Sequence, residues 1–110
     1  MRQRLKSVKD HLDKKLKDVY FKELYELEQE KMKLAKHFVD FRIKHDLTQN
    51  ELADMLGVTQ QHVSKLEEGI FSNIRDVAKM LLAIGYRIEF NTVHIPEKVS
   101  KKFRARLQAA

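Results

Sequence analysis

The chain has 110 residues, of which 43% are hydrophobic and 35% are charged, with three glycines and one proline. This length and balance indicate one domain with a modest core. They exclude both a wholly disordered chain and a turn-rich β-sandwich or barrel, so we expect an α-rich protein. The absence of cysteine excludes disulfide scaffolds, thiolate zinc sites and thiol nucleophiles.

The formal net charge of +6 comes from the two ends of the sequence. Residues 1–22 carry a net charge of +5, residues 23–96 carry −3 and residues 97–110 carry +4. Such an excess favours a polyanionic partner, although basic termini are also common on proteins that bind nothing charged. No apolar run is long enough for a signal peptide or a membrane span, so we expect a cytoplasmic protein.

The first segment, residues 1–33, has the apolar spacing of a helical extension. Side chains at steps of three and four form one stripe, which comprises Leu5, Val8, Leu12, Leu16 and Val19. The pattern continues through Leu24 and Leu27 and then from Leu34 to Phe41. We expect a bend or break in this helical region near residues 28–31.

Local signals delimit three further helices. Thr48 and Glu51 have the spacing of a capping box, and Gly57 can supply the positive φ that ends the helix. Thr59 is a suitable cap for the next helix, which is expected to reach Glu67 or Glu68 and to stop at Gly69. A third helix is expected to start at Ser72 or Asn73 and to close at Gly85.

Residues 86–96 carry the one strand signal of the sequence. Apolar and polar side chains alternate from Tyr86 to Val93, which predicts a C-terminal β-strand. Pro96 separates this segment from a basic tail, residues 97–110.

The two helices on either side of Gly57 have the composition of a helix-turn-helix. Ala53 is small where the helices would cross, Gly57 lies at the turn four residues later, and Val63 can fill the wedge between them. Leu52, Leu56, Val58 and Leu66 would complete the core of this pair. An ordinary helical hairpin with the same turn is the alternative.

Residues 47–69 resemble the Cro/cI-type (XRE) helix-turn-helix family. The matching residues are Leu47-Thr48-Gln49-x2-Leu52-Ala53-x2-Leu56-Gly57-Val58-Thr59-Gln60-x2-Val63-Ser64-x-Leu66-Glu67-x-Gly69. The resemblance implies an all-α, lambda-repressor-like bundle of about five helices over residues 34–85. It also implies a DNA-binding repressor, associated with the bacterial nucleoid, whose third helix reads the major groove.

The polar face of that helix supplies the predicted DNA contacts. A glutamine can bond both N7 and N6 of adenine, and a lysine can reach O6 and N7 of guanine. By the resemblance, Gln60, Gln61 and Lys65 would contact bases. A second set would contact the DNA backbone or the edge of the site, namely Gln49, Thr59, His62 and Ser64. The alternative is that these are solvated polar residues without a ligand.

Dimerisation is expected because one short helix covers few base pairs, so two copies would bind a palindromic operator. The predicted strand has an unpaired edge, and pairing with its symmetry mate would place Ile88 and Phe90 in the dimer contact. The alternative is packing of Ile84, Tyr86 and Phe90 against the other subunit without a ladder.

The order of segments resembles that of HigA-type antitoxins in type II toxin–antitoxin systems. This resemblance implies a cognate toxin, a RelE/HigB-like ribonuclease, that contacts an aromatic surface of the N-terminal helical region at Tyr20, Phe21, Leu24 and Tyr25. These residues could instead pack on the bundle, and the basic residues 1–22 suit a basic toxin poorly. A free-standing phage or plasmid repressor, a protein-binding adaptor and an RNA-binding protein are the alternatives.

Enzymatic chemistry has no support in the sequence. The five histidines include no pair at i, i+4, and the four serines lie in no nucleophile elbow or glycine-rich loop. We therefore expect no catalytic residues, no metal site and no cofactor.

Overall fold

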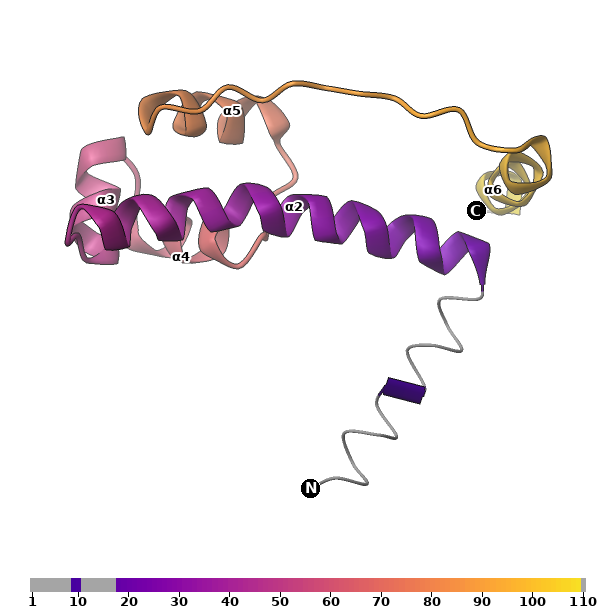
Figure 1. Cartoon of the computed structure of the whole chain (residues 1–110), viewed down its shortest axis with the longest axis horizontal. Helices are drawn as coiled ribbons and strands as arrows, with labels where there is room; N and C mark the ends of the chain where they lie inside the picture. The colour runs from indigo at the N-terminus through magenta and orange to yellow at the C-terminus, as the bar shows by residue number, and fades with distance from the viewer. Residues whose placement is uncertain (1–8, 11–17, 110) are drawn as a thin grey trace. The chain divides into compact units, whose positions relative to one another are not determined.

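The computed structural model describes residues 9–10 and 18–109. The labelled elements of this part of the chain are helices, in the order α2 (Val19–Lys44), α3 (Gln49–Leu56), α4 (Gln60–Glu67), α5 (Ile74–Ala83) and α6 (Glu97–Ala109) (Figure 1). The chain divides into two compact units, which comprise Met1–Leu27 with Asn91–Ala110 and Glu28–Phe90. The segment limits at 33, 85 and 96 stay predictions.

The predicted fold class was wrong in its C-terminal β-strand. Residues 86–96 form neither helix nor strand and connect α5 to α6, as the orange segment of Figure 1. A strand needs a ladder partner for its backbone groups, and the described residues contain no other strand. The alternation in the sequence has another cause, because Ile88 packs against the core between exposed Arg87 and Glu89.

Of the bend or break expected near residues 28–31, the break was wrong, because α2 is one continuous helix of 26 residues. The side chain of Asp18 caps its start by accepting from the backbone amide of Tyr20 at 2.9 Å. The residues that interrupt the apolar stripe near 28–31 are good helix formers, and two ion pairs, each between side chains one helical turn apart, stabilise the helix there. These pairs join Lys31 to Glu28 and Lys33 to Glu30.

The predicted helix boundaries around α3 and α4 are confirmed. The amide of Glu51 donates to Oγ1 of Thr48 at 3.1 Å, and the amide of Thr48 donates to Glu51 Oε1 at 3.0 Å, which completes the capping box. Thr59 accepts from the amide of His62 at 3.1 Å at the start of α4. Gly57 ends α3 in the left-handed region at a φ of 70°.

The start of α5 decides between the two predicted caps. Oδ1 of Asn73 accepts from the amide of Asp76 at 3.1 Å, so Asn73 and not Ser72 is the N-cap. The other two glycines that were expected to end helices, Gly69 and Gly85, also have positive φ values, of 75° and 97°.

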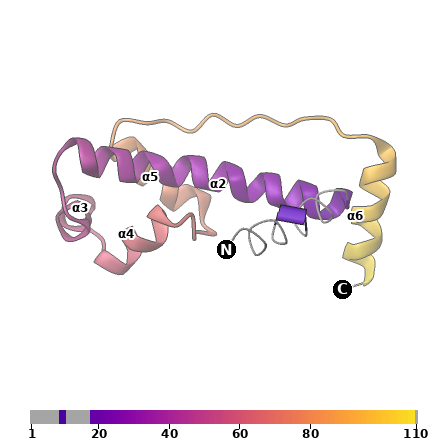
Figure 2. The same cartoon turned by 60° about the horizontal axis from the view of Figure 1, so that its bottom comes forward.

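The core of the unit Glu28–Phe90 joins four helices. Figures 1 and 2 show α3, α4 and α5 gathered around the C-terminal part of α2. Each helix contributes apolar side chains with little or no exposure, which are Phe38, Leu52, Ala53, Val63, Leu66, Val77, Met80 and Leu81, together with Ile84 just after α5. An isolated helix of eight residues is not stable in water, so α3 and α4 depend on the burial of their apolar side chains in this core.

The predicted basic tail contains a helix, α6, in the other unit. Its Val99 is buried, and the ring of Phe103 lies 4.6 Å from the ring of Tyr20 on α2. The apolar stripe predicted for Leu5 to Leu16 falls outside the described residues. Of the helices that are described, none is both long and apolar enough to cross a membrane.

Candidate nucleic-acid interface

The turn between α3 and α4 has the predicted helix-turn-helix packing. Ala53 and Val63 have exposed fractions of 2% and 0%, so a small and a branched side chain fill the angle between the helices. The amide of Gly57 donates to the carbonyl of Asp54 at 3.2 Å, and that of Val58 donates to Ala53 at 3.0 Å. These bonds close the end of α3 and direct the chain into α4.

Helix α4 has one buried face and one polar exposed face. Val63 and Leu66 are buried in the core. Gln60, Gln61 and Lys65, the three predicted base contacts, are exposed. Their side chains are therefore accessible to a ligand. An eight-residue helix of this kind has the size to enter the major groove of B-DNA.

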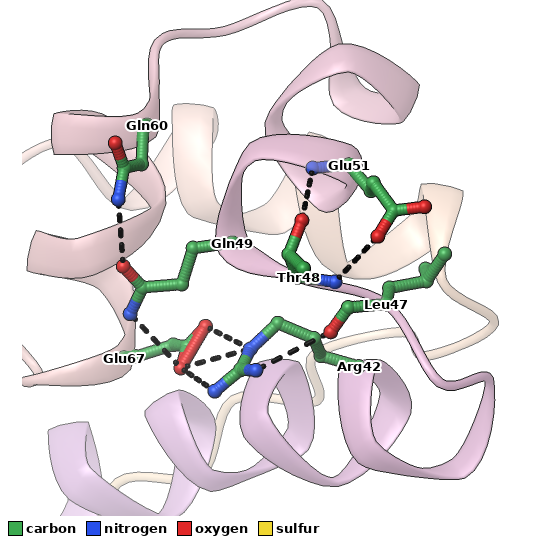
Figure 3. A network of polar contacts seen from close by, with 7 residues as sticks. All are labelled: Arg42, Leu47, Thr48, Gln49, Glu51, Gln60 and Glu67. Carbon is green, nitrogen blue, oxygen red and sulfur yellow. Dashed lines mark hydrogen bonds and ion pairs between the residues drawn. The ribbon is translucent and has the colours of Figure 1, made fainter.

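A chain of side-chain hydrogen bonds connects α4 to α3 and α2 (Figure 3). Nε2 of Gln60 donates to Oε1 of Gln49 at 3.5 Å, and Nε2 of Gln49 donates to Oε1 of Glu67 at 3.5 Å. Gln49 is half-buried and was predicted to contact a DNA phosphate. Its amide group bridges the first residue of α4 and a carboxylate at the end of the same helix.

Arg42 and Glu67 form the anchor of this network, and sequence reasoning missed both. The guanidinium Nε and Nη2 of Arg42 each donate to the Glu67 carboxylate at 3.0 Å, and Nη1 donates to the carbonyl of Leu47 at 3.3 Å. The hydrogen bonds from Arg42 to Glu67 raise the pKa of Arg42 above its ordinary value, so the guanidinium stays charged. The side chain of Glu67 is only 7% exposed.

A signal for this ion pair was present in the sequence. Glu67 follows Val63 by four residues, which places a carboxylate beside the buried face of α4. A charge at such a position needs a partner, and Arg42 lies 25 residues away in sequence. Helical periodicity alone does not identify a partner at that distance.

The remaining predicted contacts have different environments. Thr59 uses its hydroxyl to cap α4, while Ser64 is half-buried. Nε2 of His62 lies 3.1 Å from Oδ2 of Asp76 on α5, an ion pair when the imidazole is protonated. An open hollow of about 320 Å³ lies between α4 and the start of α5, and its lining includes Thr59, Gln61, His62, Lys65 and Asp76 but not Ser64.

The predicted toxin contacts on the first turns of α2 are not equally free. The ring of Tyr20 is held by Phe103 and by the guanidinium of Arg106, whose Cζ lies 3.9 Å from the ring centre. The rings of Phe21 and Tyr25 stack at 6.3 Å, and Leu24 is 42% exposed. A partner could meet Leu24 directly, whereas Tyr20 already packs within its own chain.

The predicted dimer contacts also differ in exposure. Ile88 packs against the core of its own chain, and Ile84 is part of that core. Tyr86 stacks on His37 at 4.1 Å but stays partly exposed, and Phe90 is 76% exposed. A contact between copies would therefore use Tyr86 and Phe90 rather than Ile84 and Ile88.

A family model described as helix-turn-helix matches residues 40–91. The matched segment contains the end of α2 and all of α3, α4 and α5, so it coincides with the network and the exposed face described above. This is a family of DNA-binding regulatory domains rather than of enzymes, and the match supports a DNA-binding transcription regulator. No curated protein matches the chain, and no solved structure matches it.

Proposed function

We propose that this protein is a transcription repressor that recognises a DNA sequence by placing α4 in the major groove. The observation that carries the proposal is the division of α4 into two faces: Val63 and Leu66 are buried while Gln60, Gln61 and Lys65 are exposed. A polar face on a core-anchored helix suits readout of base edges because it presents hydrogen-bonding groups without loss of packing.

The residues of this face have separate roles in the proposal. Gln60 and Gln61 contact adenine, and Lys65 contacts guanine. Gln49 begins α3, so its backbone amide is one of the unpaired donors of a helix N-terminus and can bind a phosphate while its side chain orients Gln60. Thr59, Ser64 and His62 lie beside the base-reading residues and contact the DNA backbone or the edge of the site.

Two copies would bind a palindromic operator. The reading helix has eight residues, which restricts each copy to one half-site. The exposed rings of Tyr86 and Phe90 supply apolar surface for the contact between the copies. Analytical ultracentrifugation over a series of protein concentrations tests this dimer, and Phe90→Ser should weaken it. The proposal would be refuted if the wild-type chain bound a duplex with two half-sites as a single copy.

The DNA-reading proposal is tested by selecting binding sites from a random duplex library. Gln60→Ala and Gln61→Ala should each lower affinity for the selected duplex by about 1–3 kcal/mol and leave binding to random duplexes almost unchanged. Gln29→Ala, a replacement of an exposed glutamine on α2, is the matched control. If the two variants lose affinity equally on selected and random duplexes, α4 does not read bases.

We further propose that the repressor is an antitoxin that neutralises a RelE/HigB-like ribonuclease toxin and represses its own operon. This step rests on the HigA-like order of segments and on the exposed Leu24 and Leu27 of α2. A pull-down from the native host at low and moderate salt tests it. Stoichiometric recovery of a small basic protein with promoter DNA supports the antitoxin, whereas DNA alone favours a free-standing repressor.

A further inference from the structure

The unit that reads DNA in the proposed function is not itself positively charged. Residues 28–90 contain nine lysines and arginines against ten aspartates and glutamates, a net charge of −1. Residues 91–110 contain five basic residues against one acidic residue, a net charge of +4. Because affinity for duplex DNA depends on cations that replace condensed counterions, cations outside residues 28–90 would add to it.

Helix α6 is amphipathic, and the first part of its apolar face is occupied, whereas Leu107 further along the helix is 77% exposed. Val99 and Phe103 are four residues apart on one side; Val99 is buried, and Phe103 packs against the ring of Tyr20. Arg106, which lies beside this face, places its guanidinium over the same ring at 3.9 Å. The helix is therefore attached to the first turns of α2 within their common unit.

Another side of α6 carries three lysines. Lys98, Lys101 and Lys102 have the i, i+3, i+4 spacing of one helix face, and all three are exposed. The other cations of the helix are engaged, since Arg104 pairs with Glu97 and Arg106 stacks on Tyr20. Within the described part of the chain, these lysines have no carboxylate at ion-pair distance.

We propose that Lys98, Lys101 and Lys102, here called the lysine face of α6, form a second DNA-binding surface that contacts phosphates without reading bases. The proposal rests on the proposed function, which makes duplex DNA the polyanion that this protein meets. A lipid surface fits less well, because an interfacial helix inserts its apolar face, and on that face of α6 Val99 and Phe103 are already packed, which leaves Leu107 exposed. The surface would add affinity for every duplex equally.

The test is the salt dependence of binding to a labelled 30-base-pair duplex of random sequence, measured with the full chain. Lys98→Gln/Lys101→Gln/Lys102→Gln should reduce the slope of log K against log salt by about 0.9 for each phosphate that is no longer neutralised, so by up to about 2.7 per chain. Lys98→Arg/Lys101→Arg/Lys102→Arg should retain the wild-type slope because it keeps the charge. Glutamine and arginine both favour helix, and circular dichroism checks that α6 persists.

The matched control removes the same charge from the other unit. Lys33→Gln/Lys36→Gln/Lys79→Gln replaces three exposed lysines of α2 and α5 and should change the slope by less than about 1. Equal slope changes in the two triple variants would overturn the proposal, since net charge alone would then act. An unchanged slope in the α6 variant would overturn it as well.

Two further probes distinguish phosphate binding by α6 from lipid binding and from base reading by α4. Anionic phosphatidylserine vesicles are the second probe; a variant that loses vesicle binding but keeps the wild-type slope on DNA would overturn the proposal in favour of a lipid surface. The selected duplex is the third probe. The α6 variant can show the reduced slope of log K against log salt while Gln60→Ala and Gln61→Ala leave binding to the selected duplex unchanged. That result would support phosphate binding by the lysine face and contradict base reading by α4.

Discussion

Gln60, the first residue of α4, donates from Nε2 to Oε1 of Gln49, the first residue of α3, although eleven residues separate them in sequence. Gln49 is held in turn by Glu67, and Glu67 by Arg42 (Figure 3). An exposed side chain thus takes its orientation from an ion pair that begins on α2. Preorganisation of this kind lowers the entropy that Gln60 loses when it binds a base.

Gln49→Ala should weaken operator binding more than it weakens the fold. The change removes the acceptor that orients Gln60, so we expect a loss of about 1 kcal/mol or more on the selected duplex. The free energy of unfolding in urea should change by about 0.5 kcal/mol or less, because the side-chain bonds of Gln49 are long and partly solvated. Asn50→Ala, one residue further along α3 and exposed, is the control, and an equal effect of both substitutions on DNA would contradict the orienting role.

Glu67→Gln should destabilise the unit of residues 28–90. The substitution keeps the shape of the side chain but removes the charge that Arg42 pairs with, and hydrogen bonds to charged groups contribute about 1.5–3 kcal/mol. Urea denaturation measures this loss. The neighbouring Glu68→Gln, at an exposed position, should change stability by about 0.5 kcal/mol or less.

The double substitution Arg42→Met/Glu67→Leu tests whether the ion pair itself is needed for stability. Replacement of both charges by apolar groups removes the unpaired cation that Glu67→Gln leaves, so it should recover most of the stability that Glu67→Gln costs. Operator binding should stay reduced, because Gln49 would have no acceptor at position 67. Full recovery of both properties would show that the network does not act on the reading face.

Ala53→Leu should overpack the angle between α3 and α4. Ala53 is 2% exposed where these helices meet, and added methylenes in a close-packed core cost about 1–3 kcal/mol. Met55→Leu, two residues further on the same helix and 56% exposed, is the matched control. The comparison is made by thermal melting, and equal melting temperatures for Ala53→Leu and wild type would contradict the crossing at this residue.

Gly69→Ala and Gly57→Ala separate backbone strain from steric conflict. Both glycines have positive φ, so an alanine at either position should cost about 1 kcal/mol. A Cβ at Gly57 would meet no atom within 4 Å, whereas a Cβ at Gly69 would lie 2.8 Å from Sδ of Met32. Met32 is flexible and 45% exposed, so its thioether can shift, and Gly69→Ala should be only slightly less stable than Gly57→Ala in urea denaturation. Met32→Ala should remove that small difference.

Features that depend on neighbouring residues were predictable from the sequence. The capping box at Thr48, the cap at Thr59 and the turn at Gly57 each require residues only a few positions apart. Two local interpretations failed because the pattern had another cause. The gap in the apolar stripe at residues 28–31 is bridged by ion pairs on one continuous helix, and the alternation after Tyr86 reflects one half-buried side chain, Ile88, rather than a ladder.

Features that depend on distant residues were not predictable in the same way. The pairing of Arg42 with Glu67 joins α2 to α4, which are separated in sequence by α3. The contact of His62 with Asp76 depends on how α5 packs on α4. The helix in residues 97–109 was not predicted, because five basic side chains dominate this segment and its apolar stripe is short. Val99 and Phe103 carried that stripe in the sequence.

The charge count of residues 28–90 has a consequence for the time that the protein needs to find one site in a genome. A reading unit with a net charge of −1 gains little from long-range attraction, whereas lysines on α6 would keep the chain close to any duplex while it slides or hops. Substitutions at Lys98, Lys101 or Lys102 would then alter the search time. The preference for one sequence over another would stay with Gln60 and Gln61, so speed and selectivity could change independently.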